Sequence, residues 1–73
     1  MAKRTYPYRD LGDRCRVLRN KRKLSQLDVV RNYEFSLSHY QKIERGALDP
    51  RFTTLRKLAD VYGVTVAELL KGL

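Results

Sequence analysis

Residues 25–46, SQLDVVRNYEFSLSHYQKIERG, contain two short segments with the features of helices and a brief connection between them. Ser25 offers a hydroxyl N-cap, and Asp28 follows it at the spacing of a capping box. Ser36 is a second N-cap candidate, and Gly46 is a natural left-handed stop for the helix that Ser36 begins. The pattern therefore predicts two successive helices separated by a tight turn.

The second of these helices has two different faces. Tyr40 and Ile43 are three residues apart and can share an inward face. Another face carries a row of side chains at helical spacing: Leu37, Ser38, Gln41, Lys42 and Arg45. Solubility alone does not require an exposed leucine, so this row predicts a contact surface; a merely solvated face is the alternative.

The rest of the chain predicts three more short helices and no strand. Apolar residues recur at helical spacing over residues 8–18 and again over residues 52–62. Thr65 and Glu68 have the spacing of a second capping box. The five expected helices run from near Pro7 to about Arg22, from Ser25 to about Asn32, from Ser36 to Gly46, from Phe52 to Gly63 and from Val66 to Lys71. We therefore expect an all-α fold, a compact five-helix domain.

Size and charge limit the kinds of partner. The 73 residues suffice for one domain, and 16 Lys and Arg against 8 Asp and Glu give a net charge of +8. A balance this basic favours a polyanionic partner over a small-molecule ligand. We expect residues 1–7 to form a basic N-terminal arm and residues 8–73 a single domain, with the two-helix unit at about residues 25–45.

Neither a membrane nor an enzymatic role is expected. No apolar run approaches the roughly 20 residues that span a bilayer, and a lone cysteine cannot form an internal disulfide, so a cytoplasmic protein is the simplest interpretation. Cys15 and His39 are the only conceivable nucleophile pair, but Cys15 falls on the apolar stripe of residues 8–18. The same two residues fall short of a zinc site, so no metal or other cofactor is expected.

Two short helices joined by a tight turn, the second with a polar face, describe a helix-turn-helix, whose second helix lies in the DNA major groove. Further residues recur at specific spacings: Leu11-Gly12, Leu18-Arg19, Leu24-Ser25-Gln26, Ser36, Ile43-Glu44-Arg45-Gly46, Pro50, Leu55, Leu58-Ala59, Gly63-Val64 and Glu68-Leu69-Leu70. With these residues, the chain resembles the phage repressor and Cro family of helix-turn-helix regulators, also described as lambda repressor-like or XRE-type.

The resemblance implies a sequence-specific regulator of transcription that binds double-stranded DNA through a recognition helix at residues 36–46. The positions that face base edges are then Leu37, Ser38, Gln41 and Lys42, with His39 at a base or a phosphate. The chemistry is suitable, because Lys42 can donate to guanine, Ser38 can donate or accept, and Leu37 can lie against a thymine methyl group.

Phosphate contacts are also implied by the resemblance or by position. The candidates are Gln26, Ser36, Arg45, Arg51 and Thr53. Gln26 stands at the start of a helix, where free backbone N–H groups attract anions. The alternatives are an additional capping role for Gln26 and plain solvation of Arg45, Arg51 or Thr53.

Two family positions concern the support of the recognition helix. The resemblance implies a structural ion pair between Arg19 and Glu44, which would orient the recognition helix. Glu34 stands at the turn position where the family usually has glycine with a positive φ. The turn is therefore expected to be either strained or different in geometry.

A domain of this size reads few base pairs by itself, whereas a two-fold dimer reads two half-sites of a palindromic operator. Val66, Leu70 and Leu73 could form such a dimer interface; packing of Val66 and Leu70 onto the domain's own core is the alternative. We expect a repressor or an autoregulatory controller from a bacterium or phage. A protein-binding module or antitoxin-type adaptor with the same fold is the competing interpretation.

Overall fold

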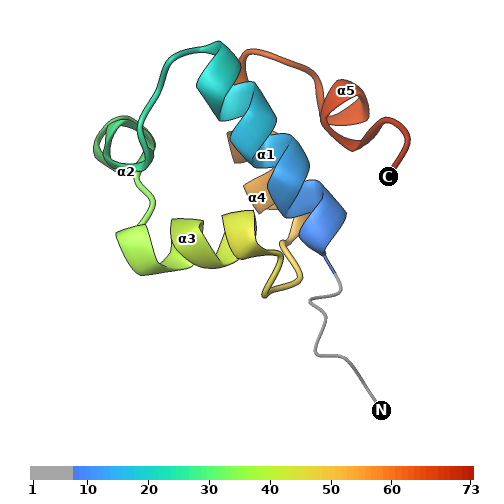
Figure 1. The fold of residues 1–73 in the computed structure, drawn as a ribbon, viewed down its shortest axis with the longest axis horizontal. Coiled ribbons are helices and arrows are strands. Elements are labelled where there is room, and N and C mark those ends of the chain that lie inside the picture. Colours follow the sequence, from blue (N-terminus) through green and yellow to red (C-terminus); the bar gives the residue numbers. More distant parts are fainter. Residues whose placement is uncertain (1–7) are drawn as a thin grey trace.

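The structure is a computed structural model that describes residues 8–73, and these residues form five helices and no strand. The helices are α1 (Arg9–Lys21), α2 (Gln26–Tyr33), α3 (Leu37–Arg45), α4 (Phe52–Tyr62) and α5 (Val66–Leu70) (Figure 1). The expected all-α, five-helix fold is confirmed. Within the described part of the chain, no helix combines the length and the apolar character needed to cross a membrane.

Side-chain caps fix where three of the helices begin. In α2, the Ser25 hydroxyl accepts from the backbone N–H of Asp28 at 3.0 Å, and the Asp28 carboxylate accepts from the Ser25 N–H at 2.8 Å. Thr65 and Glu68 repeat this reciprocal pair at the start of α5, at 3.0 and 2.8 Å. Ser36 caps α3 through its side chain alone. Both capping boxes are therefore formed at the places that the sequence predicts.

The helix ends differ slightly from expectation. α1 begins at Arg9, after an N-cap residue, Tyr8, that makes no side-chain cap. α2 continues one residue further than expected, to Tyr33. α5 ends at Leu70 because the next residue, Lys71, leaves helical geometry with a ψ of 124°. Such differences of a residue or two at helix ends are ordinary.

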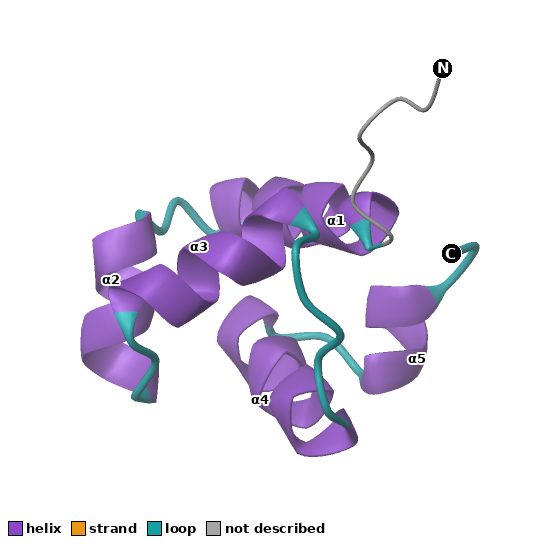
Figure 2. Cartoon of the chain, turned by 90° about the horizontal axis from the view of Figure 1, so that it is seen from below, coloured by secondary structure: helices purple, strands orange, loops and turns teal. Residues whose placement is uncertain are grey.

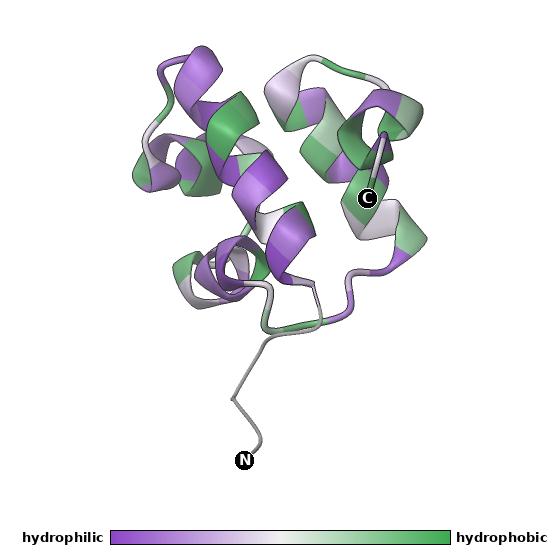
Figure 3. Cartoon of the chain, turned by 45° about the vertical axis from the view of Figure 1, so that its right-hand side comes forward, coloured by the Kyte–Doolittle hydropathy of each residue, from purple (hydrophilic) through white to green (hydrophobic). Residues whose placement is uncertain are grey.

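The hydrophobic core lies between all five helices. Its largest fully buried side chains are Tyr40, Leu58, Leu69, Val29, Val61 and Cys15. In Figure 3, hydrophobic segments recur along α4 and α5, whereas α1 is mainly hydrophilic. Phe52 begins the apolar repeat of α4 but is 63% exposed and does not belong to the core.

Two glycines allow α1 and α3 to pack closely. A Cβ atom at Gly12 would lie 2.3 Å from the carbonyl oxygen of Glu44, and one at Gly46 would lie 2.4 Å from the backbone nitrogen of Arg9. Gly46 also ends α3 with a φ of 75°, a conformation that glycine adopts without strain. Figure 2 shows α3 against α1, with α4 below them. The close approach fixes α3 on the domain.

Candidate nucleic-acid interface

α3 has the two faces that its sequence predicts. The inward residues Tyr40, Ile43 and Glu44 are all less than 5% exposed. Leu37, Ser38, Lys42 and Arg45 are exposed, and His39 and Gln41 are half-buried. Leu37 has 38% of its surface exposed although it is aliphatic. The outer face therefore offers hydrogen-bonding groups, a cation and an apolar side chain together, which is the set that reads base edges.

The first turn of α3 uses some of its polar groups internally. The Ser36 hydroxyl accepts from the backbone N–H of His39 at 3.1 Å, and Ser36 itself remains exposed. The His39 ring packs against the Phe35 ring, with 5.9 Å between the ring centroids. Ser36 therefore begins the helix, while the other backbone N–H groups of the first turn point toward its N-terminal end.

A buried carboxylate holds α3 in place. Glu44 is 4% exposed, and its Oε2 accepts from Arg19 Nε at 2.6 Å. Its Oε1 accepts from Arg19 Nη2 at 3.1 Å and from Gln26 Nε2 at 3.0 Å. Arg19 also donates through Nη1 to the carbonyl of Leu24, at 2.8 Å. The Arg19–Glu44 pair that the resemblance implies is thus present, and it connects α1, α2 and α3 through one carboxylate.

The surroundings of Glu44 keep it ionised. Burial raises the pKa of the Glu44 carboxyl, but hydrogen bonds from Arg19, Tyr40 and Gln26 lower it, and the net pKa is below its usual value of 4.5. The bond to Glu44 in turn raises the pKa of Arg19. Both partners are therefore charged at neutral pH, and each offsets the cost of burying the other.

Gln26 lies between this carboxylate and the outer face of α3. Its Nε2 donates to Glu44, and its Oε1 accepts from Gln41 Nε2 at 3.3 Å. One hydrogen on the Gln26 amide nitrogen remains available for a further acceptor. The sequence places Gln26 at the start of α2, but the bridge to Gln41 follows only from the packing of α2 against α3.

A second polar link lies beneath α3. The hydroxyl groups of Tyr40 and Tyr62 are 2.6 Å apart and buried, and burial raises the pKa of both. Burial also raises the pKa of the Cys15 thiol to about 11. A buried, protonated thiol is a poor nucleophile, which argues against a catalytic Cys15. Among residues 8–73, no group of His, Cys, Asp or Glu side chains is arranged to hold a metal ion.

The turn between α2 and α3 keeps the conformation that glycine usually supplies. Glu34 has φ 60° and ψ 41°, so the turn is left-handed at this residue and the glutamate is strained. Lys57 of α4 donates to the carbonyl of Glu34 at 2.9 Å, and its ammonium group lies 4.5 Å from the centroid of the Phe35 ring. Lys57 therefore holds the turn from the side of α4, a role that no local sequence pattern reveals.

The remaining candidate contacts lie around α3 and at the C-terminus. Arg45, Arg51 and Thr53 are all exposed. A groove of about 200 Å³ lies near the end of the chain, and its apolar lining includes Leu11, Pro50, Leu55, Leu70 and Leu73. Leu73 is 52% exposed, Leu70 is partly buried against the core, and Val66 is half-buried. The basic arm expected at residues 1–7 lies outside the described residues.

Known proteins share most of this domain. A family described as a helix-turn-helix domain matches residues 10–71. The HTH-type transcriptional regulator DdrOP3 of Deinococcus deserti is 39% identical over 62 residues, which cover 85% of this chain and 48% of that protein. The cryptic phage CTXphi transcriptional repressor RstR of Vibrio cholerae is 37% identical over 59 residues, covering 81% and 53%. The immunity repressor protein of Bacillus phage phi105 is 30% identical over 60 residues, covering 82% and 42%. The chain spans about half the length of these curated relatives.

Proposed function

Because this chain belongs to the phage repressor and Cro type of helix-turn-helix family, we propose that it is a regulator of transcription that binds double-stranded DNA in a sequence-specific manner. The observation that carries the proposal is the anchoring of α3 through Glu44, which leaves the opposite face of α3 exposed. A helix that is fixed at its base can present side chains to the major groove in one orientation.

Bases are read by the outer face of α3. Lys42 donates to guanine O6 or N7, Ser38 donates or accepts, and Leu37 contacts a thymine methyl group. Gln41 reads an adjacent base while it is held by Gln26. His39 contacts a base or a phosphate at the edge of this surface.

Phosphates fix the register of the domain on the duplex. Gln26 uses its remaining amide hydrogen together with the free N–H groups at the start of α2. Ser36, Arg45, Arg51 and Thr53 lie at or beyond the two ends of α3 and contact the backbone there. The net charge of +8 attracts the protein to DNA of any sequence before the bases are read.

The regulator acts as a repressor that occupies its operator in the cytoplasm. Two of the relatives are named as repressors, which supports repression rather than activation. A repressor of this kind blocks access to a promoter by occupying it and requires no catalysis.

The protein binds a palindromic operator as a dimer. The groove that includes Leu70, together with the exposed Leu73, supports an apolar two-fold contact. Leu73→Glu should lower the dimer fraction in sedimentation with operator DNA. Val17→Glu is the matched control, because Val17 is 53% exposed, close to the 52% of Leu73, and does not line this groove. Equal loss of dimer in both variants would remove this interface.

Selection of bound duplexes from a random pool tests the function. The salt concentration should be about 0.15 M, since low salt retains any sequence on a basic protein. We expect a palindromic motif with half-sites about 10 base pairs apart, and an altered motif for Lys42→Ala at one position of each half-site. A pool that remains random would contradict the proposal and would favour a protein-binding adaptor.

A further inference from the structure

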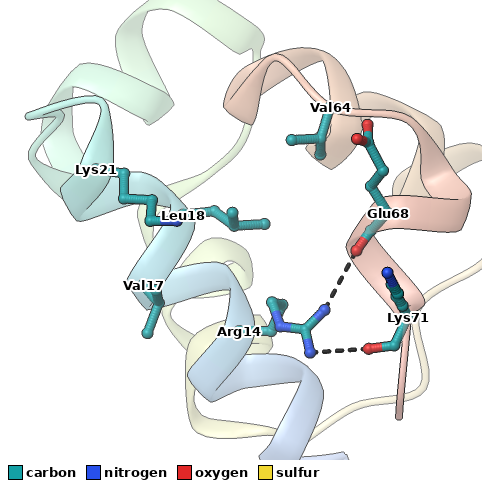
Figure 4. A pocket seen from close by; sticks show the side chains of 7 residues that line it. All are labelled: Arg14, Val17, Leu18, Lys21, Val64, Glu68 and Lys71. Carbon is teal, nitrogen blue, oxygen red and sulfur yellow. Dashed lines mark hydrogen bonds between the residues drawn. The ribbon is translucent and has the colours of Figure 1, made fainter.

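A second groove, of about 390 Å³, lies between α1 and α5 (Figure 4). Its apolar lining consists of Val17 and Leu18 from α1 and of Val64 from the segment before α5. Lys21 and Lys71 line its two sides. An apolar lining flanked by ammonium groups is suited to a ligand that is apolar in the middle and anionic at its edges.

The groove has a firm base. Arg14 of α1 donates through Nη1 to the carbonyls of Glu68 and Leu69, each at 3.2 Å, and through Nη2 to the carbonyl of Lys71 at 2.8 Å. These bonds connect α1 to the last turn of α5, where a cation also complements the helix dipole. Arg14 therefore holds the two walls of the groove together, and a ligand can bind there without moving this side chain.

The uncompensated charge of the groove is positive. Lys21 and Lys71 form no ion pair with any residue in the described range 8–73. Glu68 is the one acidic residue of the described lining, and a hydrogen bond from a backbone N–H and the nearby Lys71 both lower the pKa of its carboxyl. Because Arg14 also lines the groove, three cations stand against this one carboxylate, and the groove keeps a net positive charge for an anionic partner.

The groove faces away from the recognition helix. Gly12 and Arg16 contact Glu44 of α3, and Arg14 lies two residues from each of them. Two residues correspond to a rotation of about 200° around a helix, so Arg14 points to the other side of α1. In Figures 1 and 2, α3 and α5 lie on different sides of the domain. A ligand in this groove would not block the outer face of α3.

We propose that this groove docks an acidic, amphipathic segment of a partner protein. An aliphatic side chain of the segment lies against Leu18 and Val64, and flanking carboxylates pair with Lys21 and Lys71. A second copy of this basic surface would bring the same ammonium groups together, which opposes self-association there. A nucleic-acid backbone would leave the apolar lining uncovered. The partner thus reaches the domain while α3 remains accessible to DNA.

A synthetic helical peptide of about 14 residues is the probe, with leucine along one face and glutamate on both flanks. Its dissociation constant is measured with the full chain by fluorescence anisotropy at about 0.15 M salt. The groove variant is Lys21→Glu with Lys71→Glu. The control is Arg31→Glu with Arg56→Glu, which changes the net charge equally at exposed positions that do not line the groove. Thermal unfolding verifies that both variants are folded.

We expect the groove variant to bind the peptide about tenfold more weakly and the control to stay within about twofold of the unaltered chain. Peptide-induced changes in amide resonances should centre on Val17, Leu18 and Val64. Equal weakening in both variants would overturn the proposal, because it would reflect general charge attraction. Resonance changes confined to α3 would also overturn it. Weaker binding of mixed-sequence duplex DNA by the groove variant than by the control would overturn the proposal too, since the groove would then be a DNA-binding surface.

Discussion

The α carbon of Gly12 lies so close to Glu44 that a Cβ atom at position 12 would be 2.3 Å from the Glu44 carbonyl oxygen. The obstructing atoms belong to the backbone of α3 and cannot turn aside as a flexible side chain could. The position of α3 on the domain therefore depends on a hydrogen atom at residue 12.

Gly12→Ala should separate α1 from α3. Alanine favours a helix by about 1 kcal/mol over glycine, but the clash costs more, and we expect a net loss of about 2 kcal/mol in the free energy of unfolding. Urea unfolding measures the change. Gly72→Ala is the control: a Cβ there meets nothing within 4 Å, and its φ of 80° should cost only about 1 kcal/mol. A Gly12→Ala protein as stable as the unaltered chain would show that α3 has room to move.

Arg19→Met should leave a buried charge without its main partner. Arg19 and Glu44 have side chains that are 12% and 4% exposed, and removing one member of such a pair costs about 3–5 kcal/mol. The double variant Arg19→Met with Glu44→Leu should recover much of this loss, because neither charge is then buried. Urea unfolding of the single and double variants measures both effects. If the single variant is as stable as the double, the pair does not act as a unit.

The same pair predicts a dependence on pH. The pKa of Glu44 is lowered in the folded protein, so its contribution to stability is present above about pH 4.5 and is lost as the pH falls through the lower folded value. In Arg19→Met, burial raises the pKa of Glu44, so the stability lost on acidification should be smaller. Unfolding midpoints in urea between about pH 3 and pH 7 measure the difference. Parallel profiles for the two proteins would contradict this assignment.

Glu34→Gly should stabilise the protein. Glu34 has a φ of 60°, and glycine removes the strain of about 1 kcal/mol without removing the backbone carbonyl that Lys57 contacts. Lys23→Gly is a matched test at a second left-handed residue, with a φ of 59°. We expect both to raise the midpoint of thermal unfolding. A lower midpoint in Glu34→Gly alone would reveal a stabilising contact of the Glu34 side chain.

Arg14→Ala should loosen α5. Three backbone carbonyls would lose a charged donor, and we expect a loss of about 1–2 kcal/mol together with faster hydrogen exchange at Leu69 and Leu70. The control is Arg9→Ala, in the same helix. Among the described residues, Arg9 forms one ion pair, an exposed contact of 3.9 Å with Asp13. That control should change stability by less than about 0.5 kcal/mol. Equal exchange rates in both variants would show that Leu69 alone anchors α5.

Lys42→Ala and Arg51→Ala should weaken DNA binding in different ways. Lys42 is assigned to a base edge, so its loss should cost about 1–3 kcal/mol at the selected operator and little on unrelated duplexes. Arg51 is assigned to phosphate, so its loss should weaken all duplexes alike and reduce the salt dependence by about one ion. Titrations at several salt concentrations distinguish the two effects. A change in the preferred sequence on Arg51→Ala would contradict the assignment of Arg51 to a phosphate.

The starts of α2, α3 and α5 were predictable because side-chain caps are local signals. Ser25, Ser36 and Thr65 each bond to a group three residues away, which is a distance that the sequence displays directly. The two faces of α3 were predictable for the same reason, since a helical period orders its residues. The Arg19–Glu44 pair joins distant positions, and only the family resemblance suggested it.

Other contacts could not be predicted because they depend on how the helices pack. Arg14 reaches carbonyls more than 50 positions away, and Lys57 reaches the turn at Glu34 from α4. The sequence around Arg14 or Lys57 does not distinguish either residue from the other lysines and arginines of the chain.

The bridge from Gln41 through Gln26 to Glu44 divides the outer face of α3 into two kinds of position. Ser38 and Lys42 have side chains that form no hydrogen bond within residues 8–73, so either can be exchanged without disturbing the scaffold. Gln41 is tied to the carboxylate that orients the whole helix. Positions 38 and 42 can therefore vary freely, in evolution or in the design of new DNA specificities. A change at position 41 also requires a compensating change at Gln26 or Glu44.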